Sequence, residues 1–370
     1  MTIDRIQRLQ ALQRDAGIDY IALVPGPNLV YFTGLHMHLS ERPIVALLPA
    51  HPNEQPILIP PFFEVGKATS GEVPLNWSVF SYRDGQPFQD AFDAAAAQHT
   101  LAGKRIGVEP TQMRVLEWSL LSNAAAVQQA SALDLIATLR MRKDPAEIAA
   151  MRKAVQMAEG AFAQILEELH PGMTEKQAAA TLMRLMLDAG AEGMSFEPLV
   201  QFGPSASNPH GASSGRALQA GECALFDFGL VIDGYPCDIT RTIAMGIPSD
   251  EMRKIYEIVQ AANAAGRAAV RPGVTAEHID RVTRDVIEQA GYGKYFTHRT
   301  GHGIGLEGHE PPYLWAGNTL LLEPGMTFTI EPGIYVPGLG GVRIEDDIVV
   351  TANGGESLTN FERSLIQLDV

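Results

Sequence analysis

The sequence predicts an α/β (α+β) protein of two domains, an N-terminal α/β domain over residues 1–140 and a second domain over residues 146–370. Three observations support this division. Strand and helix patterns alternate through the first domain, as they do in α/β proteins. The charged stretch Leu139–Pro145 then interrupts the pattern and ends in Asp144-Pro145, a typical helix start. The second domain, finally, repeats one of its own segments.

The composition is that of a globular protein and argues against several kinds of partner. Of the 370 residues, 46% are hydrophobic and 19% are charged, which is typical of a soluble chain long enough for two domains. No apolar run is long enough to span a bilayer, and the N-terminus lacks the features of a signal peptide. The net charge of −15 disfavours nucleic acid and anionic membranes. Cys223 and Cys237 form no disulfide framework and no CxxC pair, so we expect a cytoplasmic protein.

The first domain is predicted from short apolar runs that are separated by helical patterns. An amphipathic helix is expected over residues 1–16, a second helix around 88–98, and mostly helix over 112–140. The expected strands are Tyr20–Val24, Ile44–Leu48, Pro56–Pro60, Trp77–Tyr82 and Arg105–Val108. This alternation indicates a single α/β domain.

The second domain begins with a long helix over residues 146–168 and then contains a repeated segment. His170-Pro-Gly-Met-Thr-Glu175 precedes a helix that ends at Gly190, and Arg271-Pro-Gly-Val-Thr-Ala276 precedes one that ends at Gly291. The proline, glycine, threonine and terminal glycine of the first segment each have an identical residue 101 positions later. The threonines suit helix N-caps and the last glycines suit helix C-termini. We therefore expect two related halves with a pseudo-two-fold, and a site between them would draw ligands from both.

Residues 226–242 are predicted to form two antiparallel strands joined by a turn at Asp233-Gly234. Asp227 lies six residues before Asp233, and Asp238 lies five after it, so the hairpin brings these two carboxylates roughly opposite each other. Two like charges this close are unfavourable unless a cation lies between them. Turn chemistry is the alternative explanation for an aspartate beside glycine, and it is accepted here for Asp233.

The second half supplies a histidine with unusual neighbours. His302 is flanked by Gly301, Gly303 and Gly305, and His309 follows seven residues later. Glycines at these positions allow the backbone and a bulky group to approach closely. The pattern favours a functional site, although a lone histidine is more often a surface or core residue.

Two glutamates of the second half lie in apolar strands. Glu331 ends the apolar run that begins at Thr327, and Glu345 lies within residues 341–350. Carboxylates in such strands are costly unless they are paired or bound to metal. Arg343 is the alternative, a salt-bridge partner for either glutamate, and Asp346 and Asp347 are expected to be strand-surface and turn residues.

Together these side chains form an oxygen-rich set with one nitrogen donor: Asp227, Asp238, His302, Glu331 and Glu345. That set suits a pair of divalent ions bridged by carboxylates, with Mn²⁺ as the first choice and Co²⁺ or Zn²⁺ as alternatives. Two bridged metals generate a hydroxide at neutral pH and polarise a carbonyl, so the chemistry indicated is hydrolysis.

The set resembles that of the metal-dependent pita-bread peptidases, which include Xaa-Pro aminopeptidase (aminopeptidase P) and Xaa-Pro dipeptidase (prolidase). The resemblance covers nearly the whole chain and implies a creatinase-like N-terminal domain followed by a pita-bread domain. It also implies that Asp227 binds one metal and that His302 and Glu331 bind the other. Asp238 and Glu345 would bridge the two ions.

The resemblance further implies roles in catalysis. Glu331 would be the general acid/base, and His309 would steady the tetrahedral intermediate. His210, in Ser207-Asn-Pro-His-Gly211, matches a histidine near the substrate, and Arg343 matches an arginine that supports the bridging glutamate. A homodimer is also implied.

The substrate is predicted from the segment His309-Glu310-Pro311-Pro312-Tyr313. Prolidases tend to carry an arginine at the position of Tyr313, and that arginine can hold the C-terminal carboxylate of a dipeptide. Because this chain has a tyrosine there, longer peptides should be tolerated. The sequence therefore favours an aminopeptidase P-like enzyme that cleaves the Xaa-Pro bond at the N-terminus of peptides with proline at the second position. The alternatives are a prolidase, in which another basic residue replaces that arginine, and another small-amide hydrolase of the same fold.

Overall fold

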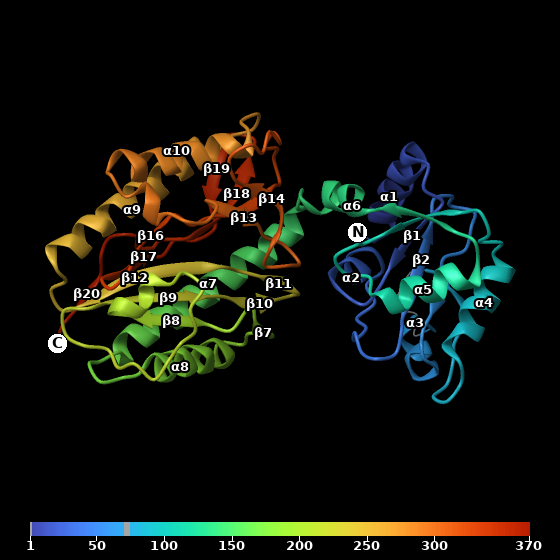
Figure 1. Cartoon of the computed structure of the whole chain (residues 1–370), viewed down its shortest axis with the longest axis horizontal. Coiled ribbons are helices and arrows are strands. Elements are labelled where there is room, and N and C mark those ends of the chain that lie inside the picture. The colour runs from blue at the N-terminus through green and yellow to red at the C-terminus, as the bar shows by residue number, and fades with distance from the viewer. Residues whose placement is uncertain (1, 70–74) are drawn as a thin grey trace. The chain divides into compact units, whose positions relative to one another are not determined.

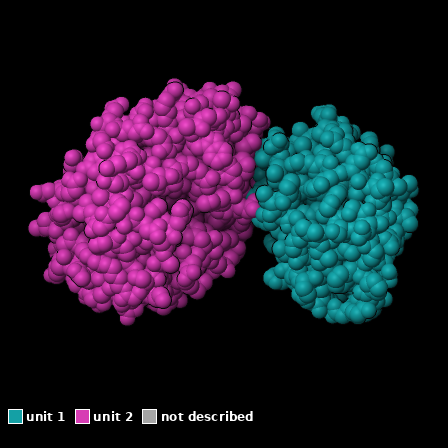
Figure 2. Space-filling model, viewed as in Figure 1, with its two compact units in different colours: residues 1–140 teal, residues 141–370 magenta. Residues whose placement is uncertain are grey.

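The computed structural model describes residues 2–69 and 75–370, and its chain divides into two compact units. The first unit is Met1–Arg140 and the second is Met141–Val370, shown in different colours in Figure 2. Each unit has its own buried hydrophobic core. Within the described residues, no helix combines the length and apolar character that crossing a membrane requires.

The first unit is built on a six-stranded sheet with the strand order β4-β3-β2-β1-β5-β6 (Figure 1). The strands are β1 (Tyr20–Leu23), β2 (Val45–Pro49), β3 (Ile57–Ile59), β4 (Ser78–Val79), β5 (Arg105–Val108) and β6 (Gln128–Ser131). The helices are α1 (Thr2–Ala16), α2 (Pro27–Thr33), α3 (Val65–Thr69), α4 (Phe88–Gln98), α5 (Val115–Ala124) and α6 (Leu133–Arg140), with a 3₁₀ turn η1 (Phe62–Glu64).

The α/β pattern predicted for the first unit is confirmed, although α2, α3 and β6 were not predicted. Strand β6 lies within the region expected to be mostly helical, between α5 and α6. It pairs in parallel with β5 at the edge of the sheet, and its residues Gln128–Ser131 are largely exposed. A polar edge strand carries no alternation of apolar residues, so the sequence pattern does not reveal it.

The second unit places its strands between two pairs of helices, with α7 and α8 on one side and α9 and α10 on the other (Figure 1). The helices are α7 (Pro145–Glu168), α8 (Glu175–Asp188), α9 (Asp250–Ala269) and α10 (Ala276–Gln289), with 3₁₀ turns η2 (Gly203–Ser207) and η3 (Gly293–Tyr295). The strands of its first half are β7 (Gly193–Met194), β8 (Leu199–Phe202), β9 (Cys223–Phe228), β10 (Leu230–Ile232), β11 (Tyr235–Pro236) and β12 (Ile239–Met245). Those of its second half are β13 (Gly301–Gly303), β14 (Glu310–Leu314), β15 (Thr327–Ile330), β16 (Gly333–Val336), β17 (Gly340–Arg343), β18 (Asp346–Thr351) and β19 (Gly354–Ser357), followed by β20 (Gln367–Leu368).

The two largest sheets of this unit belong to different halves, except that the C-terminal strand β20 joins the sheet of the first half. The four-stranded sheet has the order β20-β12-β9-β8, and the five-stranded sheet has the order β14-β13-β15-β18-β19. The first half packs on Phe162 of α7, whose ring centroid lies 5.5 Å from that of Phe226 and 4.9 Å from that of Phe228. Because side chains alternate along a strand, these contacts direct Asp227 to the opposite face of β9.

The predicted repeat is confirmed in the backbone. Helices α8 and α10 follow N-cap residues Thr174 and Thr275, whose hydroxyls accept hydrogen bonds from the backbone amides of Gln177 and His278. The terminal glycines have φ angles of 101° at Gly190 and 86° at Gly291, conformations that favour glycine. The two related halves expected from the sequence are therefore present.

Candidate metal centre and its cavity

The hairpin predicted around Asp233-Gly234 is present. Strands β10 and β11 flank the turn, where φ is 51° at Asp233 and 77° at Gly234. Beyond it, β9 and β12 pair so that Thr240, not Asp238, lies opposite Asp227. The two aspartates are therefore diagonal neighbours across the ladder, a correction to the expected opposition that still leaves their side chains close.

The glycines around His302 allow tight packing of β13. A Cβ atom on Gly301 would lie 1.9 Å from the carbonyl oxygen of Thr329, and one on Gly303 would lie 2.4 Å from that of Glu310. The imidazole of His302 is buried, and its Nε2 lies 3.6 Å from Asp238 Oδ2 and 3.4 Å from Glu331 Oε1. Close backbone packing thus places this ring between carboxylates of both halves.

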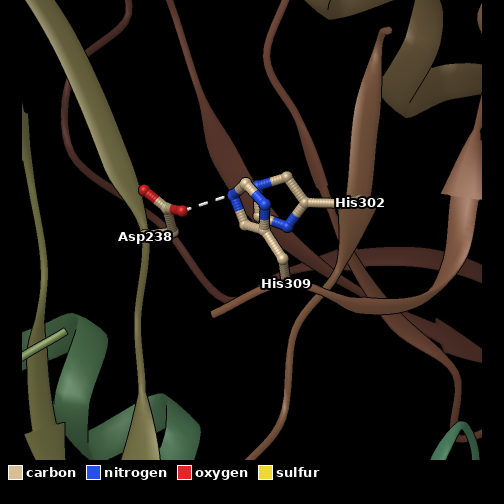
Figure 3. Close-up of side chains that lie close together, drawn as sticks. All are labelled: Asp238, His302 and His309. Atoms are coloured by element: carbon tan, nitrogen blue, oxygen red, sulfur yellow. Dashed lines mark ion pairs between the residues drawn. The ribbon is translucent and has the colours of Figure 1, made fainter. Parts of the chain in front are cut away.

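The five candidate ligands converge, although their positions in the strands differ. Glu331 directly follows β15, while Glu345 lies between β17 and β18 rather than inside one strand. Three groups have ligand atoms within 4.8 Å of one another: Asp227, Asp238 and Glu345; His302, Glu331 and Glu345; and Asp238, His302 and His309. Figure 3 shows the third group, with Asp238 facing the ring of His302 and His309 alongside. Shared carboxylates between adjacent groups are the arrangement that two bridged ions require.

The electrostatics of the cluster favour cation binding. Burial, reinforced by the neighbouring carboxylates, raises the pKa values of Asp238 and Glu345 well above their ordinary range, and burial raises the pKa of Glu331 to about 7. Burial lowers the pKa of His302 well below its ordinary value. Among the described residues, Asp227 Oδ1 is buried without a hydrogen-bond partner. A buried carboxylate oxygen without a donor is costly, so the cluster fits a pair of divalent cations.

Arg343 contributes one positive charge to this cluster. Its guanidinium donates to Asp227, to Thr240 Oγ1 at 2.9 Å and to the Tyr335 hydroxyl at 2.9 Å. Glu345 Oε2 lies 3.8 Å from Nε of Arg343 and accepts a hydrogen bond of 2.6 Å from Thr240 Oγ1. The salt bridge expected between Arg343 and a glutamate is therefore the long contact to Glu345, whereas the closer partner of Arg343 is Asp227. A single guanidinium cannot neutralise four carboxylates.

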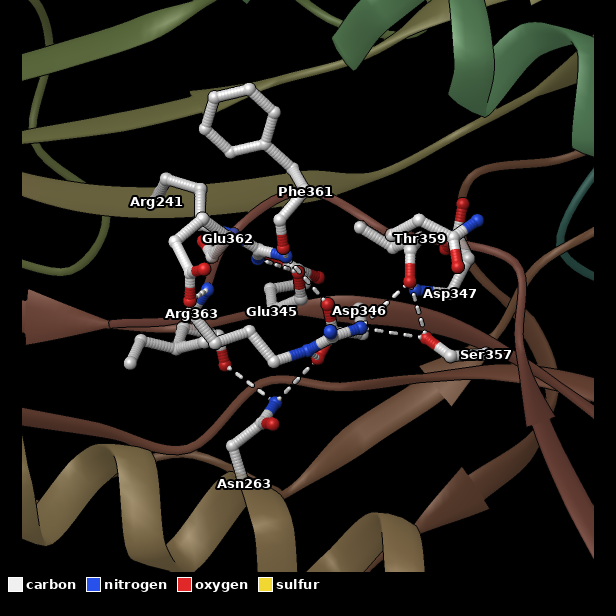
Figure 4. Close-up of polar contacts among 12 residues, drawn as sticks. Arg241, Asn263, Glu345, Asp346, Asp347, Ser357, Thr359, Phe361, Glu362 and Arg363 are labelled. Carbon is white, nitrogen blue, oxygen red and sulfur yellow. Dashed lines mark hydrogen bonds and ion pairs between the residues drawn. The ribbon is translucent and has the colours of Figure 1, made fainter. Parts of the chain in front are cut away.

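The expectation that Asp346 and Asp347 are strand-surface and turn residues is wrong, because both side chains are fully buried in β18. Figure 4 shows the network around Asp346, which accepts from Arg241 at 2.7 Å and from Arg363 at 2.8 Å. Burial alone would raise the pKa of Asp346, but Arg241 and Arg363 hold it below its ordinary value.

The same network supports two candidate metal ligands. Arg241 Nη1 also donates to the backbone oxygen of Glu345 at 2.6 Å. Asp347 Oδ2 accepts from the backbone amide of Asp238 at 3.1 Å. Sequence reasoning missed this support, since Arg241 is more than 100 residues from Asp346. The only local signal was a pair of charged residues between apolar strand residues.

A cavity of about 650 Å³ opens onto the cluster. Its walls include all five candidate ligands together with His210, His309 and Arg343. His210 is exposed on the loop after η2. Sequence reasoning missed further lining residues, among them Phe196, His298, Arg299 and Trp315. His298 and Arg299 directly precede the glycine-rich segment, and that position was the signal that could have indicated them.

Arg299 is a basic residue of this wall that contacts Tyr313, the position discussed for substrate selection. Its guanidinium carbon lies 4.5 Å from the centroid of the Tyr313 ring, and its Nη2 lies 3.1 Å from His309 Nδ1. His298 lies beside it, with Nε2 2.9 Å from the Tyr335 hydroxyl, and burial lowers the pKa of His298 to about 3. The cavity thus carries a cation close to the histidine pair.

The segment that carries His309 is anchored by a buried ion pair. Lys143 Nζ lies 2.6 Å from Glu310 Oε1, and the two side chains are 1% and 3% exposed. A Cβ atom on Gly305 would lie 2.4 Å from the same oxygen, which explains the glycine there. Glu310 is the neighbour of His309, so this pair fixes the end of the histidine segment.

Comparisons with known proteins agree with this geometry. The model of metallopeptidase family M24 matches residues 149–352, and that of the creatinase/prolidase N-terminal domain matches residues 5–142. The chain is 38% identical over 366 residues to a Lactobacillus helveticus protein named Xaa-Pro dipeptidase, covering 97% of this chain and 98% of that protein.

Solved structures resemble the whole chain. Dipeptidase PepE from Mycobacterium ulcerans is 36% identical with a TM-score of 0.92, and the match covers 100% of this chain and 98% of that one. Prolidase from Thermococcus sibiricus is 34% identical with a TM-score of 0.93, covering 100% and 99%. The predicted fold class, including the pita-bread domain, is confirmed. The chain therefore belongs to metallopeptidase family M24, with a creatinase/prolidase-type domain at its N-terminus.

Proposed function

We propose that this protein is a two-metal Xaa-Pro dipeptidase, which hydrolyses dipeptides with proline at the second position. The observation that carries the proposal is the convergence of five metal-ligating side chains on one cavity that also contains Arg299. The aminopeptidase preferred from the sequence is not confirmed, and the alternative of a dipeptidase agrees better with the names of the relatives.

The proposed ligand roles follow the overlap between the groups. Asp227, Asp238 and Glu345 would hold one ion, and His302, Glu331, Asp238 and Glu345 would hold the other. When bound, the two ions supply a nucleophilic hydroxide at neutral pH and polarise the scissile carbonyl. Manganese is the proposed metal, because the donor set is mainly oxygen with one imidazole.

The proton transfers are assigned to Glu331. Water adds its oxygen to the scissile carbonyl carbon, and the carboxylate of Glu331 accepts the proton that is released. Glu331 returns this proton to the prolyl nitrogen as the carbon–nitrogen bond breaks. Its position directly after β15, beside His302 and on the cavity wall, suits both transfers.

The remaining candidate residues stabilise the charge of the intermediate, contact the substrate or hold the metal ligands in place. His309, whose ring centroid lies 3.8 Å from that of His302, would donate to the oxygen that becomes negative in the tetrahedral intermediate. His210 lines the cavity on the side of the first half and would contact the substrate. Arg343 holds Asp227 and Thr240, and Thr240 donates to the bridging Glu345.

The dipeptide preference rests on Arg299. The sequence places Tyr313 where a prolidase tends to carry an arginine, and the guanidinium of Arg299 lies over that same ring. A guanidinium matches a carboxylate with two parallel hydrogen bonds, and stacking on an aromatic ring holds it in one orientation. A dipeptide offers a free carboxylate directly after proline, whereas a longer peptide offers a neutral amide there.

The test is hydrolysis of Ala-Pro and Ala-Pro-Ala by metal-stripped protein to which Mn²⁺, Co²⁺ or Zn²⁺ is restored separately. We expect cleavage of Ala-Pro, little cleavage of Ala-Pro-Ala, and a raised KM for Ala-Pro in Arg299→Leu. Equal cleavage of both peptides would support the aminopeptidase P hypothesis instead. Inactivity on both, with metal bound, would leave another amide hydrolase of this fold.

The proposal also includes a homodimer and a cytoplasmic location. Light scattering coupled to size-exclusion chromatography tests the first, and fractionation of cells that express the full chain tests the second. A monomer that hydrolyses Ala-Pro would remove the dimer from the proposal and leave the activity.

A further inference from the structure

The loop that carries His210 connects β8 to β9. Its first turn, η2, packs closely on β17, because a Cβ atom on Gly341 would lie 2.0 Å from the carbonyl oxygen of Ala206. His210 lies beyond this turn, and within residues 2–69 and 75–370 its own hydrogen bond runs from its backbone amide to Asn208 Oδ1 at 3.3 Å. The place of the imidazole in the cavity therefore depends on how the loop backbone is held.

Both ends of this loop meet at one buried carboxylate, that of Glu175, whose residue is 0% exposed. Its Oε1 accepts from the backbone amide of Phe202 at 2.9 Å and from the hydroxyl of Ser205. Its Oε2 accepts from the amide and hydroxyl of Ser214, at 2.8 and 2.6 Å. Each oxygen has two donors from one end of the loop, and His210 lies between the two ends.

The second half of the unit shows that the backbone frame forms without this carboxylate. The amides of Glu175 and Lys176 donate to the backbone oxygens of Arg216 and Ser214 at 3.0 and 3.1 Å. The corresponding amides of Ala276 and Glu277 donate to Leu320 and Asn318, both at 2.9 Å. The residue equivalent to Glu175 by the 101-residue repeat is thus an alanine.

We propose that Glu175 is a positioning residue, which fixes the loop 202–214 so that His210 faces the substrate. The inference rests on the proposed function of His210. The equivalent helix start folds around Ala276, so a structural need of the helix does not explain the buried acid. The need to hold the loop explains the buried acid, because the side chain of Glu175 binds both ends of that loop.

The experiment compares Glu175→Gln with wild-type protein in the manganese-loaded full chain, with Ala-Pro as substrate. The amide nitrogen of glutamine would face donors at one end of the loop. We expect kcat/KM to fall roughly 10- to 100-fold, the loss typical of a misplaced group in an active site. Manganese affinity, measured by titration calorimetry, should stay at the wild-type value. Asp188→Asn, at the exposed end of the same helix, is the matched control and should retain full activity.

A double-mutant cycle separates positioning from general damage. In a His210→Ala background, Glu175→Gln should cause no further loss, because the side chain that it positions is absent. An additive loss, or a parallel fall in manganese affinity, would overturn the positioning role. Ser214→Ala, which removes one contact from the side of the loop, gives the same test if Glu175→Gln does not fold.

The outcomes distinguish this inference from the proposed function. If His210→Ala loses activity and Glu175→Gln does not, Glu175 has no positioning role and the proposed function stands. If His210→Ala retains full activity, the proposed role of His210 fails and the inference fails with it. Loss of all activity in Asp238→Asn would still support the metal centre.

Discussion

The two halves of the catalytic unit share a frame of helices but hold their candidate ligands in different ways. In the first half, Asp227 and Asp238 lie at the end of a hairpin whose opposite face packs on Phe162. In the second half, His302 lies on a strand packed through glycines, and Glu345 lies at a break between strands. The halves meet where the amide of Glu345 donates to the backbone oxygen of Thr240 at 3.1 Å. A repeated frame can therefore be kept while each half acquires its own ligand chemistry.

The support behind the ligands differs as well. Behind the first half lies an aromatic core, whereas behind Glu345 lies the buried network of Asp346, which joins Arg363 of the second half to Arg241 on β12 of the first. A conservative change in an apolar core costs about 0.5–1.5 kcal/mol, whereas a buried charge that loses its partner costs about 3–5 kcal/mol. The second half should therefore be the more sensitive of the two to single polar substitutions.

The largest effect is expected at a ligand shared between groups. Asp238→Asn should lower kcat/KM for Ala-Pro by more than about 100-fold, since a shared ligand should matter more than the outer partners for which losses of that size are typical. Calorimetry with Mn²⁺ should show weaker binding at both sites. Asp233→Asn, in the exposed turn of the same hairpin, is the control. Full activity in Asp238→Asn would break the idea that the halves share their metals.

The next effect concerns the network around Asp346. Asp346→Asn should lower the free energy of unfolding of the metal-free protein by about 3–5 kcal/mol, because the buried Arg241 and the partly buried Arg363 lose their carboxylate. Urea unfolding measures it, with the exposed Asp285→Asn on α10 as control. If Asp346→Asn lost no more unfolding free energy than the control, the network would not make the second half more sensitive to polar substitution.

The glycines of β13 give a sharper comparison within the second half. Gly301→Ala should destabilise the protein by about 3 kcal/mol, because the added Cβ would meet a backbone oxygen that cannot move alone. Gly308→Ala has nothing within 4 Å of its added Cβ and should be nearly neutral. Thermal unfolding of both variants is the measurement, and equal melting temperatures would contradict the packing argument.

The smallest effect is a pH dependence from His298. Burial lowers the pKa of His298 to about 3, so below about 6.5 the unfolded chain binds a proton that the folded chain does not. This residue should therefore contribute a loss of stability of about 2 kcal/mol as the pH falls from 7 to 5. Urea unfolding of metal-free wild-type and His298→Asn proteins at both values tests it. The variant should lose less on acidification, and an equal loss would assign the effect to other groups.

Local chemistry made much of this structure predictable. The Asp-Gly turn, the threonine N-caps and the five candidate ligands all follow from residue types at short spacing. The sequence could not show that Asp346 is buried, because Arg241 lies more than 100 residues away and only the fold brings it there. The stacking of Arg299 on Tyr313 was not predicted either, because it depends on the register in which β13 pairs with β14, and it weakens the argument drawn from Tyr313 alone.

The buried pair of Lys143 and Glu310 has a consequence for dissecting the protein into pieces. A fragment that begins at residue 146, at the first long helix, would lack Lys143 and would remove the buried ammonium group that pairs with Glu310. A fragment that begins at residue 141 would keep both partners and the hydrogen bond of 2.8 Å from the Lys143 amide to Gly325. For recombinant expression of the catalytic unit alone, five residues of apparent linker should thus decide between soluble protein and inclusion bodies.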